Sequence, residues 1–121
     1  MVAISFLDEK ELNQLIKTCK ELSITPLVEI FNKYELNLAL DNGADVIGIN
    51  NRNLKTLKTD LNTTYDIHDV LINHNGPLIS ESGIKSKDDL LQLSNKTTIK
   101  TFLIGESILK NLNNNSIFSV L

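Results

Sequence analysis

The sequence lacks the features that mark membrane, secreted and nucleic-acid-binding proteins. Its longest apolar stretch is only a few residues, whereas about 20 are needed to span a bilayer. The first residues carry no charged segment of the kind that opens a signal peptide. A single cysteine, Cys19, cannot form an internal disulfide and fits a reducing compartment. The chain has no basic run and a net charge of −3, so we expect a cytoplasmic protein that binds neither nucleic acid nor membrane.

Arginine and glycine are also scarce. Among 12 Lys and Arg residues there is one arginine, Arg52, in a composition biased toward lysine, asparagine and isoleucine. Because such a bias readily trades arginine for lysine, Arg52 is a candidate for work that needs a planar, bidentate guanidinium. Each of the 5 glycines is expected where the backbone demands a residue without a side chain.

Short apolar segments alternate with amphipathic ones along the 121 residues. Strands are expected at residues 2–7, 27–31, 45–50, 78–81 and 101–104. Helices are expected after N-caps at Asp8, Asn32 and Ser86, over residues 63–73, and in a tail over residues 117–121. The strands are continuous apolar runs, which is typical of parallel strands covered on both faces. The sequence therefore predicts a single α/β domain with a parallel sheet.

Two architectures are compatible with this pattern. An open, flavodoxin-like sheet of five strands fits a chain of about this length. A (βα)8 barrel needs about 250 residues, roughly twice the number here. Length alone favours the open sheet, but the residues at the strand ends point to the barrel.

Polar residues follow consecutive predicted strands at their carboxyl ends, the edge at which ligands bind in both architectures. The glycines after the last two strands would also leave backbone N–H groups free to bind a phosphate without a basic side chain. An ionised carboxylate within an apolar strand is costly unless it has a partner. This cost singles out Glu29, which lies within the second predicted strand. The group comprises Glu29, Asn50, Asn51, Arg52, Glu81, Ser82, Gly83, Gly105 and Glu106.

Four blocks of sequence resemble consecutive blocks of indole-3-glycerol-phosphate synthase. They are residues 27–30, 47–54, 80–84 and 102–107, in the order and spacing of that family. The run Ile-Gly-Ile-Asn-Asn-Arg-Asn-Leu at 47–54 is the most diagnostic. The resemblance extends from Val2 to about Lys110 and implies part of a (βα)8 barrel, from about the fourth βα unit to the eighth.

The resemblance implies a lyase of tryptophan biosynthesis that works without metal or organic cofactor. Its members close, decarboxylate and dehydrate 1-(2-carboxyphenylamino)-1-deoxyribulose 5-phosphate to indole-3-glycerol phosphate. Glu29 matches a carboxylate active in acid–base chemistry, and Asn50 a polar residue near the reacting carbons. Arg52 matches the residue that holds the carboxylate of the anthranilate ring, for which a guanidinium is suited. The matched substrate-binding positions are completed by Leu54, Glu81, Ser82, Gly83, Leu103, Gly105 and Glu106, where only the N–H of the last is expected to act.

The main departure from the family is that part of the family's sequence has no counterpart here. Aligned in this way, Met1 falls at the start of the fourth strand, and the first three βα units, with two lysines and a glutamate of the site, have no counterpart. One of those lysines is the family's general acid, so the chain is expected to be inactive alone. Self-association through exposed edge strands, or pairing with the absent units, is expected. His68 and His74 are assigned to surface or helix-end positions.

Two alternatives remain beside a fragment of the synthase. One is a binding module without turnover, either a phosphate-binding half-barrel or a flavodoxin-like domain. The other is a different sugar-phosphate barrel such as phosphoribosylanthranilate isomerase, against which the block at residues 50–54 counts.

Overall fold

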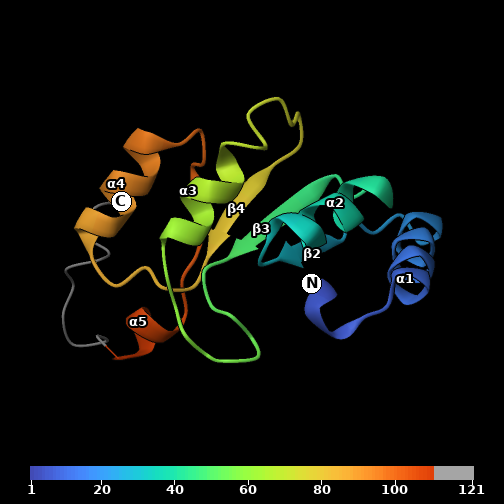
Figure 1. Cartoon of the computed structure of the whole chain (residues 1–121), viewed down its shortest axis with the longest axis horizontal. Helices are drawn as coiled ribbons and strands as arrows, with labels where there is room; N and C mark the ends of the chain where they lie inside the picture. Colours follow the sequence, from blue (N-terminus) through green and yellow to red (C-terminus); the bar gives the residue numbers. More distant parts are fainter. Residues whose placement is uncertain (111–121) are drawn as a thin grey trace.

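A computed structural model of the chain describes residues 1–110, in which strands and helices alternate as the sequence predicts (Figure 1). The predicted helical tail at residues 117–121 lies outside the described residues. The strands are β1 (Val2–Ala3), β2 (Leu27–Ile30), β3 (Val46–Asn50), β4 (Leu78–Glu81) and β5 (Thr101–Leu103). The α-helices are α1 (Glu9–Glu21), α2 (Lys33–Asp41), α3 (Asn62–His68), α4 (Lys87–Lys96) and α5 (Glu106–Lys110). Within residues 1–110, no helix has the length and apolar character needed to cross a membrane.

The strands form one parallel sheet in sequence order, β1-β2-β3-β4-β5. A flavodoxin-like sheet has the order 2-1-3-4-5, so the flavodoxin-like alternative is wrong. Sequential parallel strands joined by helices are the arrangement of a (βα)8 barrel. The described chain is therefore a partial barrel of (βα) units, as the family resemblance implies.

The helices begin at the predicted caps. Asp8 and Ser86 each form a capping box with the residue three positions later, and the Asn32 side chain accepts from the Glu35 N–H. Gly43 follows α2 with a φ of +74°, the left-handed conformation in which a helix commonly ends. These contacts are local, which explains why the sequence predicts them.

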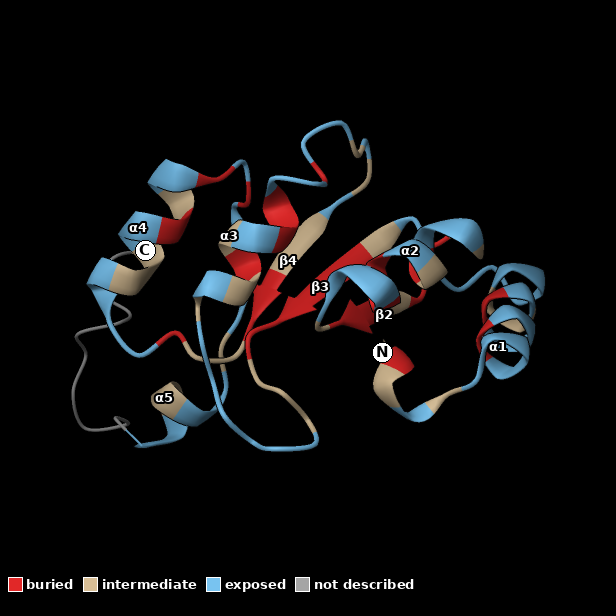
Figure 2. Ribbon diagram, viewed as in Figure 1, coloured by how far each residue is buried: buried red, intermediate tan, exposed pale blue. Residues whose placement is uncertain are grey.

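The hydrophobic core lies between the helices and one face of the sheet. Figure 2 shows the buried residues concentrated on the central strands and on the helix faces turned toward them. Side chains alternate along a strand, so the opposite face of β2, β3 and β4 carries a different set of residues. The core cluster combines strand residues Val28, Ile30, Ile47 and Ile49 with helix residues Leu12, Ile16, Leu36, Ala39 and Ile67. The opposite face carries Glu29, Gly48, Asn50 and Glu81.

Several predicted elements are shorter than expected. The first strand was predicted over residues 2–7, but β1 ends at Ala3 and a 3-10 turn at Ile4–Phe6 directs Ile4 into the core. The helix predicted over residues 63–73 ends at His68. The chain then continues in turns, one of which is closed by a hydrogen bond from the His74 N–H to Leu71 O. The second strand also ends one residue early, because the Phe31 N–H donates to the Glu35 carboxylate at 2.7 Å.

His68 occupies a helix end, one of the two predicted positions, but it does not lie at the surface. It is the last residue of α3, but it is only 5% exposed. The Thr98 N–H donates to His68 Nε2 at 3.0 Å, so the ring links the end of α3 to the segment before β5. His74 is bonded through Nε2 to the Asp45 carbonyl at 3.1 Å.

Candidate functional site

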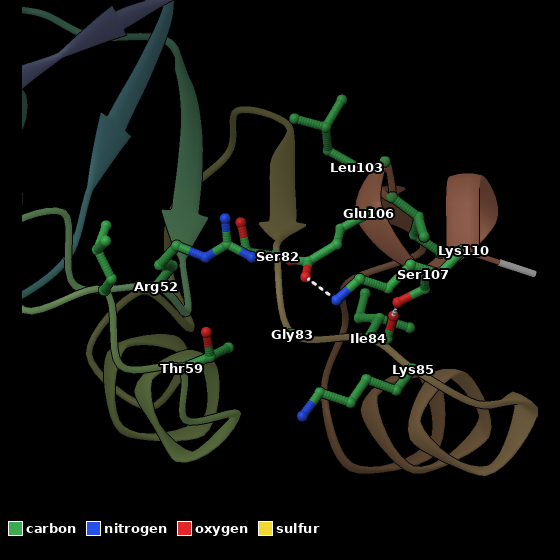
Figure 3. Close-up of a pocket in the computed structure, with 13 residues that line it drawn as sticks. Arg52, Thr59, Ser82, Gly83, Ile84, Lys85, Leu103, Glu106, Ser107 and Lys110 are labelled. Atoms are coloured by element: carbon green, nitrogen blue, oxygen red, sulfur yellow. Dashed lines mark hydrogen bonds and ion pairs between the residues drawn. The ribbon is translucent and has the colours of Figure 1, made fainter.

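A pocket of about 800 Å³ lies at the carboxyl ends of β3, β4 and β5 (Figure 3). Segments that are far apart in the sequence meet there, because parallel strands end at the same edge of the sheet. Lys85 and Lys110 also line the pocket, which the sequence pattern does not indicate. Six of the predicted site residues line it, namely Arg52, Ser82, Gly83, Leu103, Gly105 and Glu106.

The turn after β4 has a strained backbone. Ser82 has a φ of +64° and Gly83 a φ of +76°. A non-glycine residue in this region costs on the order of 1–3 kcal/mol and persists only where the surroundings enforce it. A Cβ added to Gly83 would come within 2.5 Å of Thr59 Cγ2, so both conformation and space require glycine. This confirms the prediction that glycine is needed at position 83.

The side chain of Asn51 stabilises this turn through hydrogen bonds. Its side chain is fully buried, and its Nδ2 donates to the carbonyls of Glu81 and Ser82 at 3.0 and 3.1 Å. Its Oδ1 accepts from the N–H and the hydroxyl of Thr64 at 3.2 and 2.8 Å, and Nδ2 also reaches Ser80 Oγ at 3.1 Å. The amide thus joins β3, α3 and the end of β4. The sequence pattern placed Asn51 at a strand end but did not distinguish this buried bridge from a residue facing the ligand.

Gly105, at the end of β5, does not fit the expectation that every glycine is demanded by the backbone. A Cβ built on Gly105 meets nothing within 4 Å, and the residue does not have a positive φ. The space beside Gly105 is therefore open to a ligand in the pocket rather than filled by the protein.

Three of the four charged side chains that line the pocket, Arg52, Glu106 and Lys110, are paired with one another. The Arg52 guanidinium pairs with Oε2 of Glu106, and Lys110 Nζ lies 2.6 Å from Oε1 of the same carboxylate. Figure 3 shows the arginine and the lysine reaching this carboxylate from opposite sides. Hydrogen bonds from Lys110 and from Arg52 lower the pKa of Glu106. Only the backbone N–H of Glu106 was predicted to act, so this side-chain contact is new.

A second group of predicted site residues is buried on the sheet face opposite the helices. Glu29 is 5% exposed, Asn50 5% and Glu81 2%. The Asn50 Nδ2 donates to Glu29 Oε1 at 2.5 Å, and Asn50 Oδ1 accepts from the Arg52 N–H at 2.9 Å. The amide of Asn50 thus connects the buried carboxylate to the backbone of the residue whose side chain lines the pocket.

Glu81 occupies space that a missing side chain leaves free. A Cβ added to Gly48 would lie 1.9 Å from Glu81 Oε1, so only glycine at position 48 allows the carboxyl group to sit there. Burial, and then the neighbouring Glu29 carboxylate, raise the pKa of Glu81 from 4.5 to about 7. Its Oε1 has no hydrogen-bond partner among residues 1–110. A carboxyl group of this kind carries a proton over part of the neutral range and can donate a hydrogen bond.

The predicted residues therefore fall into two groups joined through Asn50. Six line the pocket, and Glu29, Asn50 and Glu81 form the buried cluster. Leu54 belongs to neither, since it lies half-buried in the turn after Arg52 and does not line the pocket. In the part of the chain that the structure describes, no group of three or more His, Cys, Asp or Glu side chains could hold a metal ion.

Comparison with known proteins finds one family along nearly the whole chain. The family described as "Indole-3-glycerol phosphate synthase" matches residues 1–120. The chain is 40% identical over 114 residues to the indole-3-glycerol phosphate synthase of Aquifex aeolicus (strain VF5), covering 93% of this chain and 44% of that protein. It is 38% identical over 110 residues to the synthase of Thermoanaerobacter sp. (strain X514), covering 91% and 41%. It is 39% identical over 113 residues to the "Tryptophan biosynthesis protein TrpCF" of Buchnera aphidicola subsp. Schizaphis graminum (strain Sg), covering 93% and 24%. The chain spans about two fifths of the length of the synthases it matches.

Proposed function

The chain belongs to the indole-3-glycerol phosphate synthase family, and from this membership we propose that it supplies the phosphate- and carboxylate-binding part of a synthase active site. The substrate would be 1-(2-carboxyphenylamino)-1-deoxyribulose 5-phosphate, which the complete site closes, decarboxylates and dehydrates. The observation that carries the proposal is the pocket that joins Arg52 to the turns at Gly83 and Gly105.

The phosphate is bound at the two glycine turns. The Ser82–Gly83 backbone is held in a strained left-handed conformation, and such turns commonly present N–H groups to an anion. Open space at Gly105 and the ammonium groups of Lys85 and Lys110 in the same pocket favour an anionic ligand. We expect inorganic phosphate to bind weakly through these amides, and removal of Arg52 to leave that binding nearly unchanged.

The reacting end of the substrate lies toward the buried cluster. Glu29 takes part in acid–base chemistry, with its carboxylate oriented by the Asn50 amide at 2.5 Å. Glu81 binds the hydroxyl groups of the substrate, and its raised pKa supports this role because a protonated carboxyl can donate as well as accept. Arg52 binds the ring carboxylate, which matches the geometry of its guanidinium. Leu103 lines the pocket and would contact the apolar part of the substrate.

The chain has no turnover by itself. The family's general acid is a lysine from βα units that precede the matched region, and a positioned acid or base typically contributes about 10²–10⁴-fold to a rate. The unpartnered Oε1 of Glu81, among the described residues, supports a site completed by a donor from another polypeptide segment.

The strand edges of this chain are the surfaces through which that completion would occur. β1 and β5 are the outer strands of the sheet, and β5 leaves Leu103 49% exposed. Met1 and Phe6 beside β1 are 75% and 68% exposed. Unpaired strand edges and exposed apolar side chains favour association. For the chain of 121 residues taken alone we propose a homodimer, and sedimentation at micromolar concentration as a single 13.5 kDa species would contradict it.

Two measurements test the function. In the first, the chain is titrated with inorganic phosphate and followed by amide NMR, where the signals of Gly83 and Gly105 should move first. Uniform shifts, or none, would contradict the phosphate site. In the second, the chain is mixed with a polypeptide carrying the first three βα units of a related synthase, and formation of indole-3-glycerol phosphate is measured.

Glu29→Gln and Arg52→Lys should both impair the restored activity, whereas Glu21→Gln at an exposed position of α1 should not. Turnover by the rigorously purified chain alone would refute the assigned roles. Phosphate binding without any restored activity would favour the alternative, a phosphate-binding half-barrel that is not catalytic.

A further inference from the structure

The Glu106 carboxylate lies between two cations from different elements of the pocket. Its Oε2 pairs with the guanidinium of Arg52, which follows β3 and is 54 residues away in the sequence. Its Oε1 is 2.6 Å from Nζ of Lys110, one turn further along α5 (Figure 3). The guanidinium that lines the pocket is therefore already bound to a carboxylate of the same chain.

We propose that Glu106 is a specificity-determining residue of this pocket, where its carboxylate competes with the carboxylate of a ligand for Arg52. This inference rests on the proposed function, in which Arg52 binds the ring carboxylate of the substrate. A guanidinium presents a planar fork that accepts a carboxylate from either source in the same geometry. A ligand carboxylate must then displace Glu106 from Arg52.

Lys110 keeps the Glu106 carboxylate paired after a ligand has displaced it from Arg52. The two side chains are four residues apart on α5, the spacing at which side chains on a helix are neighbours. When a ligand binds Arg52, the Glu106 carboxylate remains paired with the Lys110 ammonium instead of being left unpaired beside an anion. Ligands that do not bind Arg52 do not need this exchange, so Glu106 affects only the ligands that use the guanidinium.

The exposure of the side chains sets the size of the effect. The Arg52 side chain is 34% exposed, that of Glu106 50% and that of Lys110 72%. Exposed ion pairs are weak, so a ligand can break the contact between Arg52 and Glu106. Removing the charge of Glu106 should raise the affinity for a carboxylate by about 1.5-fold to fivefold.

The test uses anthranilate as the carboxylate probe and the full chain at neutral pH and low ionic strength. Arg52 is the one arginine of the sequence, so its guanidinium Nε–H gives a single assignable NMR signal. Anthranilate affinity is measured from this signal, and from amide shifts around the pocket, in the wild type, Glu106→Gln, Arg52→Gln and the double variant. Glu21→Gln, at an exposed position of α1, makes the same change of net charge far from the pocket.

The expected result is a gain of about 1.5-fold to fivefold in anthranilate affinity for Glu106→Gln, none for Glu21→Gln, and none when Glu106→Gln is added to Arg52→Gln. Equal affinity in the wild type and Glu106→Gln, or no binding of anthranilate to either, overturns the competition. A gain that persists without Arg52 also overturns it, because the effect would then be general electrostatics. The phosphate titration at Gly83 and Gly105 is read separately, so failure of the competition is distinguishable from failure of the proposed phosphate site.

Discussion

Replacing Asn51 with alanine should be one of the most destabilising changes available near the pocket. The side chain is fully buried and makes hydrogen bonds to Ser80, Glu81, Ser82 and Thr64. Truncation to a methyl group leaves the Ser82 carbonyl without its partner, whereas the Glu81 carbonyl still accepts from the Asn51 N–H at 2.8 Å and the Thr64 N–H still donates to Leu61 O at 3.1 Å. The hydroxyls of Ser80 and Thr64 keep their mutual contact at 2.8 Å and add little to the loss.

The magnitude follows from the groups that are left unpaired. A buried donor or acceptor without a partner costs about 1–3 kcal/mol. Water entering the space of the lost amide relieves part of this cost, so we expect Asn51→Ala to lower the free energy of unfolding by about 1–3 kcal/mol. Since domains are stable by only about 5–15 kcal/mol, this is a large fraction of the total. The Ser82–Gly83 turn should also lose its strained conformation, which the amide signal of Gly83 would report.

Urea unfolding followed by circular dichroism measures the change, at a fixed chain concentration because association would shift the midpoint. Asn37→Ala, at an exposed position of α2, is the matched control and should change stability by less than about 0.5 kcal/mol. Asn51→Asp keeps the acceptor for Thr64 but turns an oxygen toward the Glu81 and Ser82 carbonyls, so it should be at least as harmful. A loss below about 1 kcal/mol for Asn51→Ala, or a loss equal to the control, would refute this account of the bridge.

Two further predictions concern Glu81 and the glycine turns. The pKa of Glu81 is raised from 4.5 to about 7 in the folded chain, so its contribution to stability is complete below about pH 4.5 and is lost as the pH rises to about 7. Urea unfolding across this range should show the wild type losing on the order of 3 kcal/mol relative to Glu81→Gln, and a constant difference between the two would contradict the shift. Gly83→Ala should cost about 1–3 kcal/mol, because its φ is +76° and its Cβ would meet Thr59 at 2.5 Å. Gly105→Ala, with nothing within 4 Å of its Cβ, should change stability by less than about 0.5 kcal/mol, and equal effects in the same unfolding assay would contradict the assignment.

Features that depend on neighbouring residues were predictable from the sequence. The capping boxes at Asp8 and Ser86 join residues three positions apart, so their pattern is visible in the sequence itself. The alternation of apolar and amphipathic segments predicts the order of strands and helices for the same reason. Glycine at position 83 was predicted from its place after a strand, whereas the contact with Thr59 that also requires glycine there comes from the tertiary structure. The family blocks added the identity of the strand-end residues, which periodicity alone does not provide.

Other features depend on which segments lie side by side, and these needed the tertiary structure. The strand order distinguishes a partial barrel from an open sheet, yet both have the same sequence of elements. His68 becomes buried only because the segment containing Thr98 packs against the end of α3. Residues 4–6 of the predicted first strand instead form a 3-10 turn, because Ile4 packs into a core contributed mainly by later residues.

The same distinction separates the two kinds of site residue. Asn50, Asn51 and Arg52 are adjacent in the sequence, and their side chains have three different partners: Glu29, the carbonyls after β4, and Glu106. These partners lie 21, 30 and 54 residues away, and the parallel register of the sheet decides which side chain meets which. The sequence determines that polar residues gather at the carboxyl ends of the strands. Their pairing into a buried carboxylate, a bridge under a strained turn and a paired guanidinium is decided by the tertiary structure, because contacts between distant segments form only when the sheet assembles.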